Sequence, residues 1–227
     1  MLDVKTGLLI LNKPVGPTSH DMVSKLRKIT GIKKIGHAGT LDPFASGVLI
    51  VAIGREATRK IDKFVKLDKE YVATLHLGFS SDTFDRMGKI TKWPSEIKEI
   101  GVDEVQKVLQ KFIGEQDQLP PMFSAKKING KKLYELAREG KTVVRKPARI
   151  NIYNIELLKY EWPFLEIKIE CSTGTYIRAL ANDMGTSLNC GAYLENLKRT
   201  SVGPYREEEA VNIEKITVAN WPEFLFA

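Results

Sequence analysis

The stretch GHAGTLDPFASGVLIVAI at residues 36–53 joins a glycine-rich loop to a run of apolar residues. The run from Val48 to Ile53 is bounded by Gly47 and Gly54, a length and setting typical of a strand. Because the run has no polar alternation, both of its faces must be covered, as they are in the centre of a sheet. The stretch therefore predicts a central strand that follows an irregular loop.

This loop contains an Asp-Pro pair framed by Gly36, Gly39 and Gly47. Pro43 pushes Asp42 toward extended backbone, and glycines reach conformations that other residues avoid, so the loop can hold one fixed shape. The neighbours of Asp42 are apolar, and a partly dehydrated carboxylate needs a cation to stay ionised. Asp42 is thus a candidate reactive carboxylate. Asp-Pro is also a common turn opener, and the loop alone favours this simpler interpretation.

Hydrophobic periodicity, caps and turn residues predict the other elements. Further strands are expected at 8–11, 69–79, 150–160 and 165–172. Helices are expected from Thr18 or Ser19 to Gly31, at 56–65, from about Asp103 to Phe112, and at 175–188. Residues 32–46 are expected to form a loop throughout. Strands and helices are interleaved without a regular βαβ repeat, so the expected fold is α+β, with helices flanking a mixed, largely antiparallel sheet.

The composition is that of a globular protein. Of 227 residues, 43% are hydrophobic and 28% are charged, which excludes a disordered chain. Two cysteines, Cys171 and Cys190, and three histidines give no disulfide framework and no metal-ligand spacing. A nucleotide-binding glycine motif is also absent, so neither a metal nor a cofactor is expected. No apolar run is long enough for a bilayer span or a signal, which predicts a cytoplasmic protein with no membrane partner.

Positive charge is in excess, with 35 Lys and Arg against 28 Asp and Glu. This balance permits a nucleic-acid partner without establishing one. The excess is densest at 121–149, where nine lysines and arginines outnumber two glutamates.

Three other residues have two possible interpretations each. Arg178 lies beside the apolar stripe in the first turn of its helix, where the helix dipole disfavours cations, so it either has an anionic partner or is simply exposed. Tyr71 falls on the apolar face of its strand, where most tyrosines only fill the core. His37 could donate to a backbone carbonyl or contact a ligand, and the sequence does not decide.

Taken together, several segments resemble the TruB family of tRNA pseudouridine synthases, which convert the uridine at position 55 in the T-loop of tRNA to pseudouridine. The match covers nearly the whole chain in order. It runs through GLLILNKP at 7–14, GHAGTLDPFASGVL at 36–49, KEYVATLHLG at 69–78, SDTFDRMG at 81–88, PMFSAKKINGKKLYELAREG at 121–140, STGTYIRALANDMG at 172–185 and LKRTSVGPY at 197–205.

The resemblance assigns roles to the ambiguous residues. It implies that Asp42 is the catalytic aspartate, that Tyr71 is the active-site tyrosine, and that Arg178 pairs with Asp42. It also implies a set of RNA- and substrate-binding residues: Lys13, His37, Asp85, Tyr176 and Leu197, with Lys126, Lys127, Lys131 and Lys132 in a basic insertion at about 117–148 that closes over RNA.

The resemblance further implies a single catalytic domain over residues 1–227 that binds the T-arm of tRNA and needs no cofactor. Many family members continue into a PUA domain, and residues 206–227 are too few for one, so none is expected. We also expect a monomer with no obligate protein partner. Two other functions stay open: an RNA-binding or tRNA-folding module with secondary or lost catalysis, and an isomerase that acts on another RNA.

Overall fold

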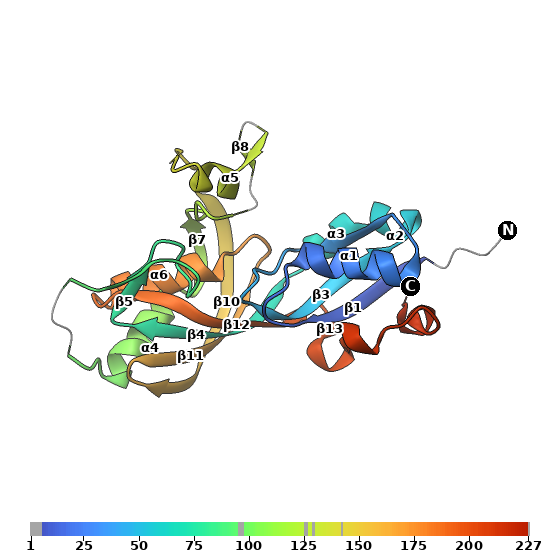
Figure 1. Cartoon of the computed structure of the whole chain (residues 1–227). Coiled ribbons are helices and arrows are strands. Elements are labelled where there is room, and N and C mark those ends of the chain that lie inside the picture. Colours follow the sequence, from blue (N-terminus) through green and yellow to red (C-terminus); the bar gives the residue numbers. More distant parts are fainter. Residues whose placement is uncertain (1–5, 95–97, 125–126, 129, 142, 227) are drawn as a thin grey trace. The chain divides into compact units, whose positions relative to one another are not determined.

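The computed structural model describes residues 6–94, 98–124, 127–128, 130–141 and 143–226. These residues form two compact units, of which the first runs up to Tyr71 and resumes at Leu197, while the second covers Val72–Asn196. Each unit contains part of a mixed, largely antiparallel sheet with helices against it (Figure 1). The predicted fold class is confirmed.

The first unit holds both ends of the described chain. Its elements are β1 (Gly7–Lys13), α1 (Ser19–Thr30), β2 (Ile35–Ala38), β3 (Ser46–Ile53), α2 (Arg55–Arg59), α3 (Ile61–Val65), the start of β4 (Lys69–Leu77), the end of β12 (Ala192–Val202), β13 (Tyr205–Arg206), η1 (Glu207–Glu209), β14 (Val211–Asn212), η2 (Ile213–Lys215) and η3 (Trp221–Phe224). Its strand order is β14-β1-β3-β12, with β2 beside β3 and β13 beside β12.

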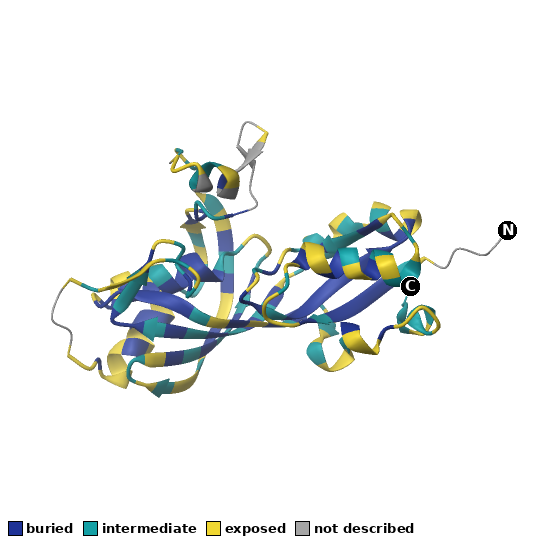
Figure 2. Cartoon of the chain, viewed as in Figure 1, coloured by how far each residue is buried: buried dark blue, intermediate teal, exposed yellow. Residues whose placement is uncertain are grey.

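The strand β3 is central, as its apolar run predicts. It pairs antiparallel with β1 from Gly47 to Ile53, and its other edge pairs with β12 and then with β2. Alternate residues of β1 and β3 face two separate cores, and both strands are buried over most of their length (Figure 2). Leu26 of α1 packs in one core, while Ala57 of α2 packs in the other with Ile61 of α3 beside it. The sheet of this unit is therefore covered by α1 on one face and by α2 and α3 on the other.

The predicted caps of α1 are confirmed. Thr18 is the N-cap, and it forms a capping box with Asp21. Gly31 ends the helix in the left-handed region, at φ 70°.

Two expectations for this unit are wrong. Residues 32–46 are not loop throughout, because the short strand β2 pairs with β3 there. The helix expected at 56–65 is two short helices, since the Lys60 amide bonds to the Ala57 carbonyl and tightens the chain into a new turn. That turn lets both Ala57 and Ile61 reach the same core.

The second unit contains the remaining elements: most of β4, β5 (Phe79–Ser81), β6 (Ile90–Lys92), α4 (Val102–Lys111), β7 (Gly114–Gln118), β8 (Lys127–Ile128), β9 (Lys131–Lys132), α5 (Leu133–Arg138), β10 (Ala148–Glu161), β11 (Phe164–Cys171), α6 (Ile177–Ser187) and the start of β12. Its strand order is β12-β4-β11-β10-β7. Buried and half-buried residues alternate along β4, as predicted, and α4 packs against α6 and β10.

The strand expected at 69–79 ends earlier than predicted. Gly78 has a positive φ of 89°, and Phe79 already belongs to β5. Both cysteines are buried. In the described part of the chain, no helix combines the length and the apolar character needed to cross a membrane.

Candidate active site

Asp42 is half-buried in the loop between β2 and β3. On one side of it, the Leu41 amide donates to Ser19 Oγ (2.9 Å), and this hydroxyl donates to the Leu41 carbonyl (3.0 Å). On the other side, the Ala45 amide donates to the Asp42 carbonyl at 3.1 Å. Leu41 and Phe44 are buried. Defined hydrogen bonds therefore hold the backbone on both sides of the carboxylate.

Lys13 lies beneath this loop, at the end of β1, with no exposed surface. Its Nζ donates to the carbonyls of Ala45 (2.6 Å), Pro14 (2.8 Å) and Pro43 (3.4 Å). Burial lowers the pKa of Lys13 to about 8, and the charge of Asp42 opposes this shift. The ammonium thus binds the loop backbone from inside, while a contact of Lys13 with RNA stays a prediction.

Two of the three loop glycines have backbone angles that favour glycine. Gly39 and Gly47 have φ values of +83° and +103°. A Cβ on Gly47 would also clash with the carbonyl of Arg199. Gly36 has no positive φ, so unusual backbone does not explain it; a Cβ there would lie only 3.2 Å from Ile61 Cδ1. Its small size allows α3 to pack on β2.

His37 of β2 is half-buried, and its Nδ1 has no hydrogen-bond partner among the described residues. Burial lowers the pKa of His37, and the charges of Arg199 and His20 act in the same direction. The imidazole is therefore neutral at neutral pH. A contact with RNA would be a hydrogen bond or a stacking contact of a neutral ring.

Tyr71 and Leu197 belong to the same unit. They are 8% and 7% exposed, in β4 and β12. This burial fits a core side chain as well as a pocket wall, so both site roles stay predictions.

Arg178 lies in the second unit, in the first turn of α6, and is 5% exposed. Its Nη1 is 3.2 Å from Asp85 Oδ2 and donates to the Thr83 carbonyl (3.1 Å). Its Nη2 donates to the Phe123 carbonyl at 2.8 Å. Of the two interpretations of Arg178, the structure bears out the anionic partner and excludes the exposed arginine. The pairing with Asp42, which belongs to the other unit, stays a prediction.

Asp85 is itself buried and well bonded. It is 4% exposed, and its Oδ1 accepts from Thr83 Oγ1 (2.7 Å) and from the Met87 amide (2.9 Å). The carboxylate therefore fixes its own loop as well as the guanidinium of Arg178. Its predicted place near bound RNA is untested.

Tyr176 is the N-cap of α6, and Gln118 holds its backbone. The Tyr176 amide donates to Gln118 Oε1 (2.8 Å), and Gln118 Nε2 donates to the Tyr176 carbonyl (3.0 Å). This pair ties the start of α6 to the end of β7. The role of the Tyr176 ring in a pocket stays a prediction.

The expected contacts of four lysines with RNA stay predictions. Lys126 lies outside the described residues, and so do the side chains of Lys127, Lys131 and Lys132.

Two sets of basic residues in the first unit were not identified as candidates from the sequence. One is Arg199, which is fully buried near the Asp42 loop. The other is a set of exposed cations on and beside α2 and α3: Arg55, Arg59, Lys60, Lys63 and Lys66. Their density in the sequence could have revealed the second group, whereas Arg199 resembles any other arginine.

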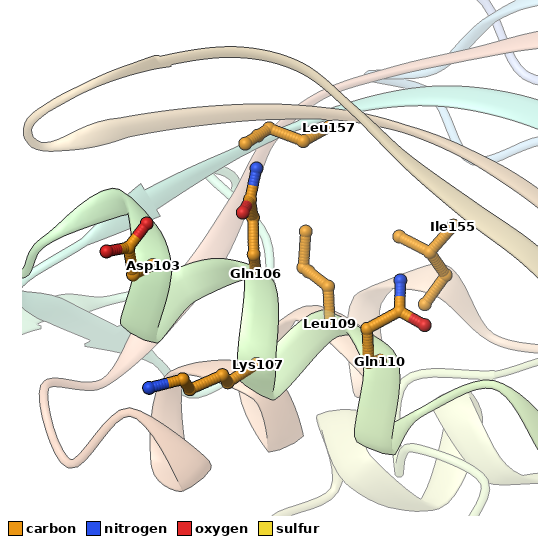
Figure 3. A pocket seen from close by; sticks show the side chains of 7 residues that line it. All are labelled: Asp103, Gln106, Lys107, Leu109, Gln110, Ile155 and Leu157. Carbon is orange, nitrogen blue, oxygen red and sulfur yellow. The ribbon is translucent and has the colours of Figure 1, made fainter.

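A hollow of about 430 Å³ lies between α4 and β10 in the second unit. Gln106 and Leu109 point from the helix toward Ile155 and Leu157 of the strand (Figure 3). It contains none of the predicted site residues. In the described part of the chain, no group of three or more His, Cys, Asp or Glu is placed to hold a metal ion.

Two family models match the chain in sequence. The "TruB family pseudouridylate synthase (N terminal domain)" model matches residues 27–177. The "tRNA pseudouridylate synthase B C-terminal domain" model matches residues 178–223.

Curated relatives are similar over almost the whole chain. The "tRNA pseudouridine synthase B" of Protochlamydia amoebophila is 49% identical over 94% of this chain and 81% of its own length. The protein with the same name from Chlamydia abortus is 46% identical over 92% of this chain and 88% of its own length.

A solved structure is similar as well. A chain in the "Crystal Structure of a Cbf5-Nop10-Gar1 Complex" is 32% identical, with a TM-score of 0.75 over 96% of this chain. This chain spans only 55% of that one.

Replacing Asp85 by alanine should lower the free energy of unfolding by about 3–5 kcal/mol, because it removes one half of a buried ion pair. Urea unfolding followed by circular dichroism measures the change. Asp62→Ala, on the exposed surface of α3, is the control, with an expected change within about 0.5 kcal/mol. A loss in Asp85→Ala as small as that of the control would contradict the structural role of the pair.

The contribution of Lys13 to stability should depend on pH. Its folded pKa of about 8 is below the ordinary 10.5, so between these values the unfolded chain binds more protons. Below about pH 8, Lys13 is charged in the folded protein, and the full free-energy cost of burying this charge destabilises the fold. This cost is lost as the pH rises from about 8 to 10.5. The free energy of unfolding of wild type should therefore increase relative to that of Lys13→Met as the pH rises from about 7 to about 10.

Urea titrations at several pH values measure this difference. Lys28→Met, at an exposed lysine of α1, is the matched control. A difference between wild type and Lys13→Met that stays flat across the window would show that Lys13 is not buried as a cation.

Proposed function

Because this chain belongs to the TruB family of pseudouridylate synthases, we propose that it isomerises the uridine at position 55 in the T-loop of tRNA to pseudouridine. The observation that carries the proposal is the ordered loop that presents Asp42, held by Lys13 and Ser19 from two different elements. A half-buried carboxylate on a fixed backbone suits a reaction in which one acid must attack or deprotonate a trapped nucleoside.

The reaction exchanges one bond of the nucleoside for another. The C1′–N1 bond breaks, the base turns while it stays bound, and a C1′–C5 bond forms. A proton leaves C5 and one is gained at N1, so atoms and electrons balance without a co-reactant. Asp42 would attack C1′ or C6, or would remove the C2′ proton to give a glycal, and the three routes remain alternatives.

Arg178 and Tyr71 have supporting roles in the proposal. Arg178 would keep Asp42 ionised and in place, in a pocket from which water is excluded so that the intermediate is not hydrolysed. This guanidinium is buried and already binds Asp85, which restricts its motion. Tyr71 would stack on the base and assist removal of the C5 proton.

A base inside a folded T-loop cannot react in place, so the enzyme must extrude it, at a cost of about a few kcal/mol. His37 is our candidate for stabilising the extruded state. Its neutral ring can stack on a base or form a hydrogen bond, and it carries no charge that would attract an RNA phosphate into the site.

Contacts with RNA phosphates would come from exposed cations. The sequence suggests those at 25–34 and 121–149. The five cations at α2 and α3 are further candidates, since all are exposed and none forms an ion pair with another described residue. Several exposed cations of the second unit differ, because they face carboxylates: Lys159 is 3.1 Å from Glu161, and Arg149 is 3.0 Å from Glu115.

Asp42→Asn should abolish pseudouridine formation while tRNA binding stays within about twofold of wild type, because the amide keeps the shape but loses the nucleophile or base. The assay is single-turnover modification of a T-loop stem-loop and of full tRNA, with binding measured in parallel. Asp62→Asn, a surface carboxylate of the same unit, is the control.

Three outcomes would argue against this assignment. Equal modification by Asp42→Asn would remove Asp42 from the catalytic site. Binding without modification by either protein would favour the RNA-binding module. Modification of another RNA, without modification of tRNA, would show that the enzyme acts on a different substrate.

The double variant Lys63→Glu/Lys66→Glu should bind tRNA about tenfold more weakly than wild type. The slope of log affinity against log salt should fall by about two, one for each lost phosphate contact. The control is Lys107→Glu/Lys111→Glu on α4, which changes the net charge equally. Equal losses in the two variants would show a net-charge effect and no specific surface at α3.

A further inference from the structure

Arg199 is buried without an ion pair. It is 1% exposed, and no carboxylate among the described residues lies within ion-pair distance of its guanidinium. A buried charge is unfavourable unless hydrogen bonds replace its hydration. The hydrogen bonds of the Arg199 guanidinium therefore indicate what this buried side chain does in the structure.

These bonds join the two ends of the Asp42 loop. Arg199 Nε donates to the Val48 carbonyl (2.8 Å), in the first half of β3, and its Nη2 donates to the Gly39 carbonyl (3.1 Å), just after β2. Asp42 lies between these two anchor points in the sequence. One planar side chain thus closes the loop that carries the carboxylate.

The backbone brings Arg199 to this position. It pairs with Gly47 in the parallel contact of β12 with β3, and any side chain at Gly47 would clash with the Arg199 carbonyl. Gly39, at the other anchor, has a positive φ of 83°, a conformation that favours glycine. Gly47 therefore allows the close approach of the Arg199 backbone, and the φ of Gly39 shapes the backbone at the other anchor.

Lys13, at the end of β1, binds the same loop between the two carbonyls that Arg199 contacts. Its Nζ donates to the carbonyls of Pro43 and Ala45, which lie within three residues after Asp42. The loop is therefore held at both ends by one cation and in its middle by another.

We propose that Arg199 is a positioning residue of the reaction, which closes the loop between Gly39 and Val48 and so places the Asp42 carboxylate. This inference rests on the function proposed above. A misplacement of a reacting group by about 1 Å can cost about 100-fold in rate, so loss of the clamp should reduce turnover. Binding of tRNA should be largely unaffected, because Arg199 is not on the surface.

Arg199→Met and Arg199→Lys test the proposal. Methionine retains much of the volume and removes the donors, while lysine keeps the charge but cannot form the two-armed grip. We expect Arg199→Met to lower kcat at least about tenfold with KM for tRNA within about twofold, and Arg199→Lys to fall between it and wild type. Arg206→Met, at an exposed arginine of β13 in the same unit, is the control.

Hydrogen exchange of the backbone amides provides a readout that is independent of activity. In Arg199→Met, exchange should accelerate at 39–47 and stay unchanged in β1. Unchanged exchange in the loop overturns the proposal, and so does an equal acceleration in β1 and the loop, which would reflect general destabilisation. If the methionine variant does not fold, the lysine variant decides: faster loop exchange with reduced kcat supports the clamp, and wild-type values overturn it.

If wild type forms no pseudouridine at all, the proposed function fails. Loop exchange then still decides whether Arg199 holds the loop of Asp42, so the two failures are distinguishable.

Discussion

The first unit depends on cationic side chains that lie beneath the Asp42 loop and donate hydrogen bonds to its backbone carbonyls. An irregular loop that packs against a core has carbonyls that no sheet can satisfy, and these need other donors. Lys13 and Arg199 supply them, with Ser19 Oγ as a third donor. The sheet makes this possible, because β1 ends at Lys13 and β12 brings Arg199 to Gly47 on opposite edges of β3. Residues far apart in the sequence therefore meet at one loop.

The second unit uses the same principle with a charge pair. Arg178 binds the carbonyls of Thr83 and Phe123 as well as the carboxylate of Asp85. The Asp85 loop is in turn fixed by Thr83 and by the Met87 amide. Groups that are held before the substrate arrives need no reorganisation during a reaction, which is how a fixed electrostatic environment accelerates chemistry. Each unit thus prepares its own charged group by internal hydrogen bonds.

The sequence predicted the parts of this architecture whose signals are local. The apolar run of β3, the helix start at Thr18 or Ser19 and the strand β4 depend on neighbouring residues, and all three predictions are confirmed. The strand β2 was missed because four residues that contain a glycine have no detectable period; it exists through pairing with β3. Arg199 was missed for a related reason. Its burial and its two acceptors arise from tertiary structure, and no pattern in LKRTSVGPY distinguishes it from an exposed arginine.

The buried cations also determine the electrostatic character of their surroundings. Arg199 contributes to the lowered pKa of His37, which keeps that ring neutral, while the charge of Asp42 opposes the lowering of the pKa of Lys13. A neutral imidazole at His37 suits the uncharged uracil ring of the proposed reaction, because a cation there would attract phosphates instead. In the proposed function, phosphate contacts come from the surface, where Arg55, Arg59, Lys60, Lys63 and Lys66 are exposed and form no ion pair with another described residue. Burial thus separates the cations that shape the loop from those that are available to a polyanion.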